Sequence, residues 1–176
     1  VLAALGARWM NVHPDRQAPF HSRATVVELN LRTIREVARF ATDLGLGLMV
    51  ENVPGWFNSG REMGELLNAV EGLGFHLDIG HANLQNDYNT TAEMLEAFGR
   101  RLRHVHLHDN KGGAHDLHLP LGAGNLDAPG CIRMLQDHGY DGTITLEVFT
   151  TDKLLLAYSR KVLKDLWDKC RELEKV

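Results

Sequence analysis

Cysteine and long hydrophobic runs are scarce in this chain, and each scarcity argues against a class of protein. Its 176 residues include two cysteines, Cys131 and Cys170, which lie far apart and outside any redox or metal-binding spacing, so a disulfide-stabilised secreted domain is not expected. No apolar run approaches the ~20 residues that a membrane-spanning helix requires. The amino-terminal residues also lack the basic-then-apolar pattern of a secretory signal. We therefore expect a cytoplasmic protein without a membrane partner.

An excess of charge of either sign is also absent. The net charge is −4 with histidine neutral, and the pI is about 6.2. Bulk charge therefore gives no indication of a polyanion as partner, although a local basic cleft on an acidic protein would still allow one. A hydrophobic share of 44% without low-complexity tracts is typical of one globular domain, which we expect to span residues 1–176.

Five short apolar runs have the length of buried strands, and each ends on a side chain that can bind metal. The runs are WMNVH, LGLMVE, GFHLD, RHVHLH and TITLE, ending at His13, Glu51, Asp78, His106 or His108, and Glu147. Between them, residues 25–44, 128–138 and 153–173 have helical character. Three capping-box spacings also predict helix starts. They are Thr25 to Glu28, Ser59 to Glu62 and Thr90 to Glu93.

This repeated strand-helix order, without a hairpin signal, predicts an α/β fold with a parallel sheet. Because every strand ends on a candidate functional residue, the pattern favours a (β/α)8 TIM barrel over a doubly wound sheet. A closed barrel needs at least ~200 residues, whereas this chain has five strand-helix units. We therefore expect an N-terminally incomplete TIM-barrel domain with strands 4–8. Its open edges would also allow pairing into a homo-oligomer.

Alternation along the strands predicts which side chains point inward. In residues 103–109, the three histidines 104, 106 and 108 share one face and Val105 and Leu107 share the other. Strand depth favours His106 as the ligand, with His104 deeper and His108 already in the loop. The same parity places Glu51, Asp78 and Glu147 inside. Ionised carboxylates that converge in a dry interior require a compensating cation. Two glutamates, an aspartate and a histidine suit Mn²⁺, Zn²⁺, Co²⁺ or Mg²⁺.

Together these strand ends form an ordered set of motifs that resembles the xylose-isomerase-like TIM barrels. The motifs are His13-Pro14, Glu51-Asn52, Leu77-Asp78-x-x-His81, Val105-His106-Leu107-x-Asp109, Asp116-x-His118-x-x-x-Gly122-x-Gly124 and Leu146-Glu147. That superfamily contains sugar phosphate isomerases and epimerases and the endonuclease IV (AP endonuclease family 2) enzymes. The resemblance implies that Glu51, Asp78, His106 and Glu147 form the metal shell that both branches share.

For the epimerase branch, the resemblance implies that Glu51 and Glu147 are also the catalytic acid and base. One removes a proton beside a sugar carbonyl and the other returns it on the opposite face, while one principal metal ion polarises the sugar oxygens. His81 would then bind and orient the substrate. Two further residues are predicted to contact the substrate, Trp56 as an apolar wall and Lys111 as a phosphate or hydroxyl contact. The leading prediction is a metal-dependent sugar or sugar-phosphate isomerase or epimerase.

For the endonuclease IV branch, the resemblance implies up to three zinc ions and hydrolysis of abasic-site DNA. The additional metal ligands would be His13, His81, Asp116 and His118. Two motifs depart from that branch, because the chain has Asp78-Ile79-Gly80-His81 in place of Asp-Thr-Cys-His and His106-Leu107-His108-Asp109 in place of His-x-Asn-Asp. This function is the alternative, with DNA as the partner. A metal-binding barrel fragment without turnover is the third reading.

Overall fold

The computed structural model describes residues 1–16 and 18–173, with side chains described up to residue 170. Five strands form one sheet in the order β1-β2-β3-β4-β5, and every neighbouring pair is parallel. The strands are β1 (Trp9–Val12), β2 (Gly47–Glu51), β3 (Gly74–Asp78), β4 (Leu102–Leu107) and β5 (Ile144–Leu146). The parallel α/β fold predicted from the strand-helix order is therefore confirmed.

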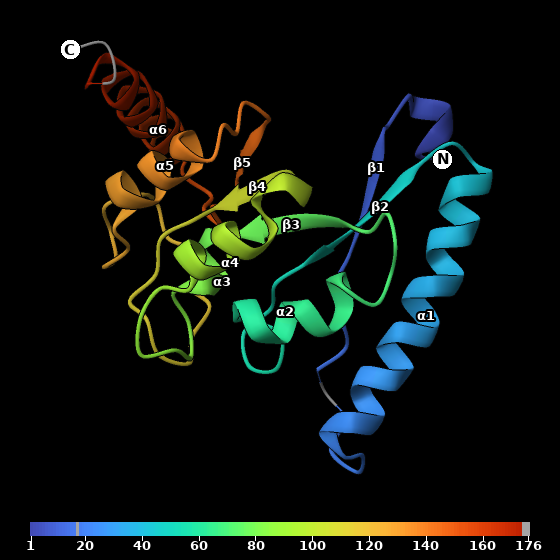
Figure 1. Ribbon diagram of the computed structural model, residues 1–176. Coiled ribbons are helices and arrows are strands. Elements are labelled where there is room, and N and C mark those ends of the chain that lie inside the picture. The colour runs from blue at the N-terminus through green and yellow to red at the C-terminus, as the bar shows by residue number, and fades with distance from the viewer. Residues whose placement is uncertain (17, 174–176) are drawn as a thin grey trace.

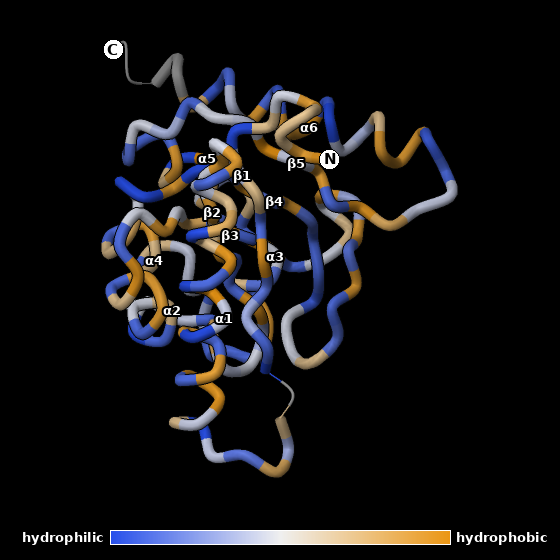
Figure 2. Tube along the Cα trace, turned by 90° about the vertical axis from the view of Figure 1, so that its right-hand side faces the viewer, coloured by the Kyte–Doolittle hydropathy of each residue, from blue (hydrophilic) through white to orange (hydrophobic). Residues whose placement is uncertain are grey.

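Helices connect successive strands and form an outer layer. They are α1 (Arg23–Asp43), α2 (Gly60–Leu67), α3 (Ile79–Ala82), α4 (Thr91–Phe98), α5 (Ala128–Asp137) and α6 (Lys153–Leu173), with short 3-10 helices at Ala3–Leu5 and Gly99–Arg101. Except for the short α3, neighbouring helices pack against one another in chain order, and Figure 1 shows α1 at one end of this series and α6 at the other. Hydrophobic and hydrophilic residues alternate along the trace of these helices (Figure 2), as expected for amphipathic helices covering a sheet. None of the helices in the described part of the chain is long and apolar enough to cross a membrane.

The core lies between the sheet and the helices. On the sheet side, Val50, Phe75, Leu77, Val105 and Leu107 have no exposed surface. Each fully buried side chain of this kind stabilises the fold by roughly 1.5–3 kcal/mol. The helices contribute the other half of the core through Met63, Leu66, Met94, Leu95, Ile132 and Leu135. The opposite face of the sheet, called the inner face here, is therefore free to carry polar residues.

Strand register aligns those polar residues in layers across the inner face. Glu51 pairs with His76 and His76 with His104, while Asp78 pairs with His106. Below these layers, the Trp9 ring lies so close to Gly47 and Gly74 that a Cβ at either glycine would overlap it. The Arg103 guanidinium lies 5.1 Å from the centre of the Trp9 ring, a cation-π arrangement. These side chains form the floor under the candidate site.

Of the three predicted capping boxes, one both marks the correct helix start and forms the expected cap hydrogen bond. Ser59 accepts a hydrogen bond from the backbone N–H of Glu62. The Thr25 box is wrong, because α1 begins earlier, with Ser22 as its N-cap. Thr90 occupies the N-cap position of α4, yet its hydroxyl donates instead to the carbonyl of Asn58. A tertiary hydrogen bond has replaced the local cap there, and it ties the start of α4 to the loop before α2.

Candidate metal centre

Four side chains converge at the carboxyl ends of the strands. Glu51 and Asp78 end β2 and β3, His106 lies near the end of β4, and Glu147 directly follows β5. One donor atom from each lies within 4.8 Å of the donors of the other three. We call these four residues the carboxylate shell. The structure thus brings together the set that strand parity predicted.

Glu51 is held by polar contacts at the base of the shell. Its side chain is 1% exposed, and its Oε2 accepts a hydrogen bond from Asn11 Nδ2. The same oxygen lies 3.0 Å from His13 Nε2 and 3.0 Å from His76 Nδ1. Burial raises the pKa of Glu51, but the close imidazoles of His106, His13 and His76 outweigh it and hold the pKa far below its ordinary value. Glu51 is therefore an ionised carboxylate.

Asp78 also points one carboxylate oxygen, which makes no hydrogen bond, into the carboxylate shell. Its Oδ1 accepts a hydrogen bond from the backbone N–H of His81 (2.8 Å), which caps α3. Its Oδ2 is buried and has no hydrogen-bond partner. Burial raises the pKa of Asp78, but the close His108 ring and the charge of His81 outweigh it and lower the pKa to about 2. Asp78 is therefore charged, with one oxygen available as a ligand.

His106 completes this donor set. Its Nδ1 lies 3.2 Å from Glu147 Oε2, 3.6 Å from Glu51 Oε1 and 3.7 Å from Asp78 Oδ2, yet makes no hydrogen bond. Burial lowers the pKa of His106, but the nearby carboxylates outweigh it and raise the pKa. A buried nitrogen and a buried oxygen that lack hydrogen bonds and face each other fit a shared cation, because leaving them unsatisfied is costly. The residues of the shell therefore fit a divalent metal ion.

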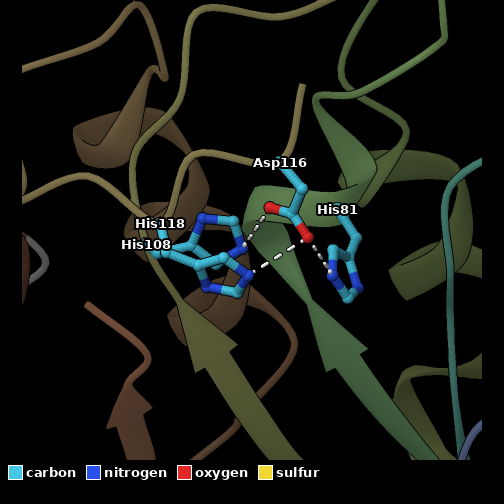
Figure 3. Close-up of side chains that lie close together, drawn as sticks. All are labelled: His81, His108, Asp116 and His118. Atoms are coloured by element: carbon cyan, nitrogen blue, oxygen red, sulfur yellow. Dashed lines mark hydrogen bonds and ion pairs between the residues drawn. The ribbon is translucent and has the colours of Figure 1, made fainter. Parts of the chain in front are cut away.

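A second convergence of ligand-type side chains lies beside the shell. We call it the loop group, and its members are His81, His108, Asp116 and His118. Asp116 Oδ2 lies 3.1 Å from His81 Nε2 and 3.1 Å from His118 Nε2, and Asp116 Oδ1 lies 3.7 Å from His108 Nε2. Figure 3 shows the Asp116 carboxylate between the His81 ring on one side and the other two rings on the other. Three imidazoles and one carboxylate are a donor set that suits Zn²⁺.

Backbone carbonyls orient two of these rings. His81 Nδ1 donates to the carbonyl of Asn52 (2.9 Å), and His118 Nδ1 donates to the carbonyl of Glu147 (2.9 Å). In both rings Nε2 is thereby directed at Asp116, the arrangement by which proteins usually fix a metal-binding histidine. The third ring, His108, has no exposed surface, and its Nε2 makes no hydrogen bond. The loop group therefore also fits a divalent ion.

Sequence reasoning missed His108 as a member of this group, and a metal-binding role for His13 stays a prediction. Parity already aligned His108 with His106, and that shared face was the available signal. His13 Nε2 instead contacts Glu51, and its side chain is 59% exposed. His13 does line the cavity of about 360 Å³ above the two groups. That cavity is lined by His13, Pro14, Asp15, Arg16, Val53, Pro54, His81, Asp116, His118 and Glu147.

Two predicted substrate contacts lie away from this cavity. Trp56 lines a neighbouring hollow together with Arg16 and His21, and packs against the core. Lys111 is exposed in the loop after β4, where its carbonyl accepts a hydrogen bond from Asn125. Neither residue is among those that line the cavity, so a role for them in substrate binding stays a prediction.

Asp109 holds the loop that carries Asp116 and His118. Its buried carboxylate accepts hydrogen bonds from the backbone N–H groups of Asn110, Gly122, Gly124 and Leu126, at 2.8 to 3.1 Å. These four bonds join both ends of the loop to the end of β4. The sequence motif includes Gly122 and Gly124 but does not predict that their N–H groups bind Asp109, because no local pattern shows which carboxylate will accept from them.

Replacing Gly124 with alanine is expected to disrupt this loop. A Cβ at this position would overlap the carbonyl oxygen of Asn110 and the carboxylate of Asp109. The backbone must shift, and we expect a loss of about 2–4 kcal/mol in the free energy of unfolding together with weaker zinc binding at the loop group. Urea unfolding and zinc titration would measure both. Ala123→Ser, at the exposed neighbouring position, is the matched control, and equal stability of the two variants would contradict the expectation.

Metal binding at the loop group is expected to release protons. Burial lowers the pKa of His81, but its hydrogen bond to Asp116 and the charge of Asp78 outweigh it and raise the pKa to about 9. At pH 7 His81 carries a proton that must leave before Nε2 can bind metal. Affinity should therefore rise about tenfold per pH unit up to pH 9 for one released proton. In the metal-free protein, the proton on His81 stabilises the fold. This stabilisation is fully present below about pH 6.5 and is lost as the pH rises through 9.

Calorimetric zinc titrations at pH 7 in two buffers of different ionisation enthalpy would measure the number of protons released. Repeating them at pH 8.5 should give a smaller number. Identical heats in both buffers at pH 7 would show that no proton leaves, and the raised pKa of His81 would then be wrong.

Comparison with known proteins places this geometry in context. A model of the protein family described as xylose isomerase-like TIM barrel matches residues 1–166. The chain is 32% identical over 144 residues to an uncharacterized protein of Methanocaldococcus jannaschii. The matched region covers 77% of this chain and 49% of that protein. It is 28% identical over 186 residues to a ketose 3-epimerase of Arthrobacter globiformis, covering 98% of the chain and 61% of the enzyme.

Solved structures give the same picture. A D-tagatose 3-epimerase-like protein superimposes with a TM-score of 0.84 at 27% sequence identity, covering 97% of this chain and 66% of that one. A protein of Thermus thermophilus described as soaked with ZnCl2 superimposes with a TM-score of 0.70 at 25% identity, covering 93% and 64%. The chain thus spans about half to two thirds of the length of these relatives.

Proposed function

The chain belongs to the xylose isomerase-like TIM barrel family, and from its site we propose that it is a divalent-metal-dependent isomerase or epimerase of a sugar or sugar phosphate. The observation that supports this most is the carboxylate shell, in which two glutamates from different strands meet an aspartate and a histidine within 4.8 Å. The similarity to a ketose 3-epimerase and to a D-tagatose 3-epimerase-like protein supports a sugar as the substrate class.

The proposed metal ligands are the four residues of the carboxylate shell, Glu51, Asp78, His106 and Glu147. A divalent ion bound there would polarise the carbonyl and hydroxyl oxygens of the sugar, which makes the neighbouring C–H bond more acidic. The oxygen-rich donor set suits Mn²⁺, Mg²⁺ or Co²⁺ as well as Zn²⁺.

Proton transfer is proposed for Glu51 and Glu147. Glu51 is ionised and enclosed at the base of the site, whereas Glu147 lines the cavity and is 29% exposed. One glutamate removes the proton from the carbon beside the carbonyl, and the other delivers a proton to the opposite face of that carbon. His81 lines the same cavity and would orient the substrate, directly or as a ligand of a second ion.

Solvent-isotope exchange tests the reaction. The chain loaded with Mn²⁺ or Co²⁺ is incubated in D2O with a panel of free and phosphorylated ketoses, and NMR follows deuterium at the carbon beside the carbonyl. We expect deuterium to enter both the substrate and its epimer. If deuterium enters no ketose while the metal is bound, the proposal is wrong.

The loop group favours a second candidate function, hydrolysis of a phosphodiester in abasic-site DNA. Its three histidines and one aspartate lie beside the carboxylate shell, so the site has donors for more than one ion. Two or more ions can activate a hydroxide and stabilise the leaving oxygen of a phosphodiester. Zinc close to three ions per chain, with incision of a DNA duplex that contains one abasic site, would support this function over epimerisation.

A further inference from the structure

A third convergence of ligand-type side chains lies deeper on the inner face, and two of its three members have no role in the proposed reaction. We call it the inner histidine group, and it consists of His76 on β3 with His104 and His106 on β4. One nitrogen from each ring lies within 4.8 Å of the others. The ring centres of His76 and His106 are 4.2 Å apart, and those of His76 and His104 are 5.0 Å apart. Register causes this convergence, because His76 pairs directly with His104 across the sheet.

His76 gives the first indication that these rings do more than pack. Its side chain is 1% exposed, and neither ring nitrogen makes a hydrogen bond. Its Nδ1 lies 3.0 Å from Glu51 Oε2, within ion-pair distance but without hydrogen-bond geometry. A buried polar group left in this state costs about 1–3 kcal/mol. An apolar residue would fill the same space without that cost, so the imidazole requires an explanation.

His104 provides the second indication. Its Nδ1 lies 2.9 Å from the hydroxyl of Thr143, and its Nε2 lies 2.8 Å from the hydroxyl of Thr145. In a neutral ring one nitrogen carries a proton and the other a lone pair. One threonine hydroxyl can accept from the protonated nitrogen and so orient the ring, while the other hydroxyl donates to the second nitrogen and would give way to a bound cation. His104 is only partly buried, so an ion can reach it from solvent.

We propose that His76, His104 and His106 form a further cation site, beneath the carboxylate shell, for a nitrogen-preferring divalent ion such as Cu²⁺ or Zn²⁺. Three imidazoles, with Glu51 as the one neighbouring carboxylate, differ in kind from the oxygen-rich shell and favour these ions over Mn²⁺ or Mg²⁺. Because His106 belongs to both groups, an ion in the inner site competes with the shell for this ring. The site depends on geometry alone and holds whether or not the chain is an epimerase.

Electron paramagnetic resonance of bound Cu²⁺ tests the site, because hyperfine coupling counts the nitrogen ligands. The loop group also has three imidazoles, so the experiment uses an Asp116→Asn/His118→Ala background that leaves it with two. In this background we expect one Cu²⁺ with three nitrogen ligands. Adding His104→Asn should remove one coupled nitrogen and weaken Cu²⁺ binding by about tenfold or more, with circular dichroism confirming an intact fold.

Two outcomes would overturn the site. The first is an unchanged nitrogen count and Kd after His104→Asn. The second is loss of the three-nitrogen signal on adding Glu147→Gln to the same background, because Glu147 belongs to the shell and not to the inner group. His76→Asn is the second ligand variant, and it should give the same loss as His104→Asn.

Discussion

Asp78→Asn is expected to lower metal affinity of the carboxylate shell about 100-fold and to destabilise the metal-free protein at neutral pH. The carboxylate has no exposed surface and lies 3.5 Å from His81 Nδ1, 3.7 Å from His106 Nδ1 and 3.3 Å from His108 Nε2. Nearby carboxylates, Asp78 among them, raise the pKa of all three histidines. Removing its charge takes away one counter-ion from each of these rings, and breaking a buried ion pair costs about 3–5 kcal/mol.

The pH dependence gives this prediction a second readout. His81 has a pKa of about 9, so its protonated form requires a counter-ion at pH 7 but no longer above pH 9. The loss in unfolding free energy should therefore be larger at pH 6.5 than at pH 9.5. Urea unfolding at both pH values, with manganese titration, measures the two effects.

Asp127→Asn is the matched control for Asp78→Asn. Asp127 is also the N-cap of a helix, and its Oδ1 accepts a hydrogen bond from the backbone N–H of Gly130 (3.0 Å), but it is exposed and belongs to neither metal group. Asparagine can keep the cap in both variants. Equal losses in the two variants would mean that Asp78 acts only as a cap, contrary to its proposed role as a ligand.

Glu147→Gln is expected to lower kcat for ketose epimerisation about 1,000-fold, because it removes one of the two proposed proton-transfer groups. Its effect on the fold should be small. The side chain is 29% exposed and contacts His106 (3.2 Å) and His118 (3.7 Å) near the cavity, away from the apolar core. We therefore expect the melting temperature to change by only a few degrees, about the shift that 1 kcal/mol produces in a domain of this size.

The measurement compares kcat at saturating metal with thermal unfolding of the same preparation. Saturation separates the loss of the proton-transfer group from the weaker metal binding that loss of a ligand also causes. Glu71→Gln, at an exposed position outside both metal groups, controls for the loss of a carboxylate. Full turnover by Glu147→Gln at saturating metal would remove Glu147 from the mechanism.

The carboxylate shell could be predicted from sequence because a simple rule governs it. Parallel strands place their carboxyl ends at one edge, and side chains two residues apart share a face. Glu51, Asp78 and Glu147 follow an apolar run at that edge, and His106 lies between two residues that pack against the helices. Local pattern was therefore sufficient for the fold and for these four residues.

The loop group could be predicted only in part, because its geometry depends on long-range contacts. His118 has a positive φ of 46°, which is uncommon for a residue with a side chain, and its ring stacks between those of His108 and Phe149. The loop around it is fixed by Asp109 through backbone N–H groups up to 17 residues away. A sequence motif identifies such residues, but the partner of each is determined by the folded chain.

The fluorescence of Trp9, which lies at the floor of the site, is expected to report metal binding. Its indole stacks with Arg103 and lies against Gly74 on the strand that also carries His76 and Asp78. The other two tryptophans lie elsewhere, Trp56 in the neighbouring hollow with Arg16 and His21, and Trp167 on α6 against the outer core. Energy transfer from an excited indole to a coloured ion falls steeply with distance. Emission from single-tryptophan variants would therefore report which level of the inner face an added Cu²⁺ or Co²⁺ ion occupies.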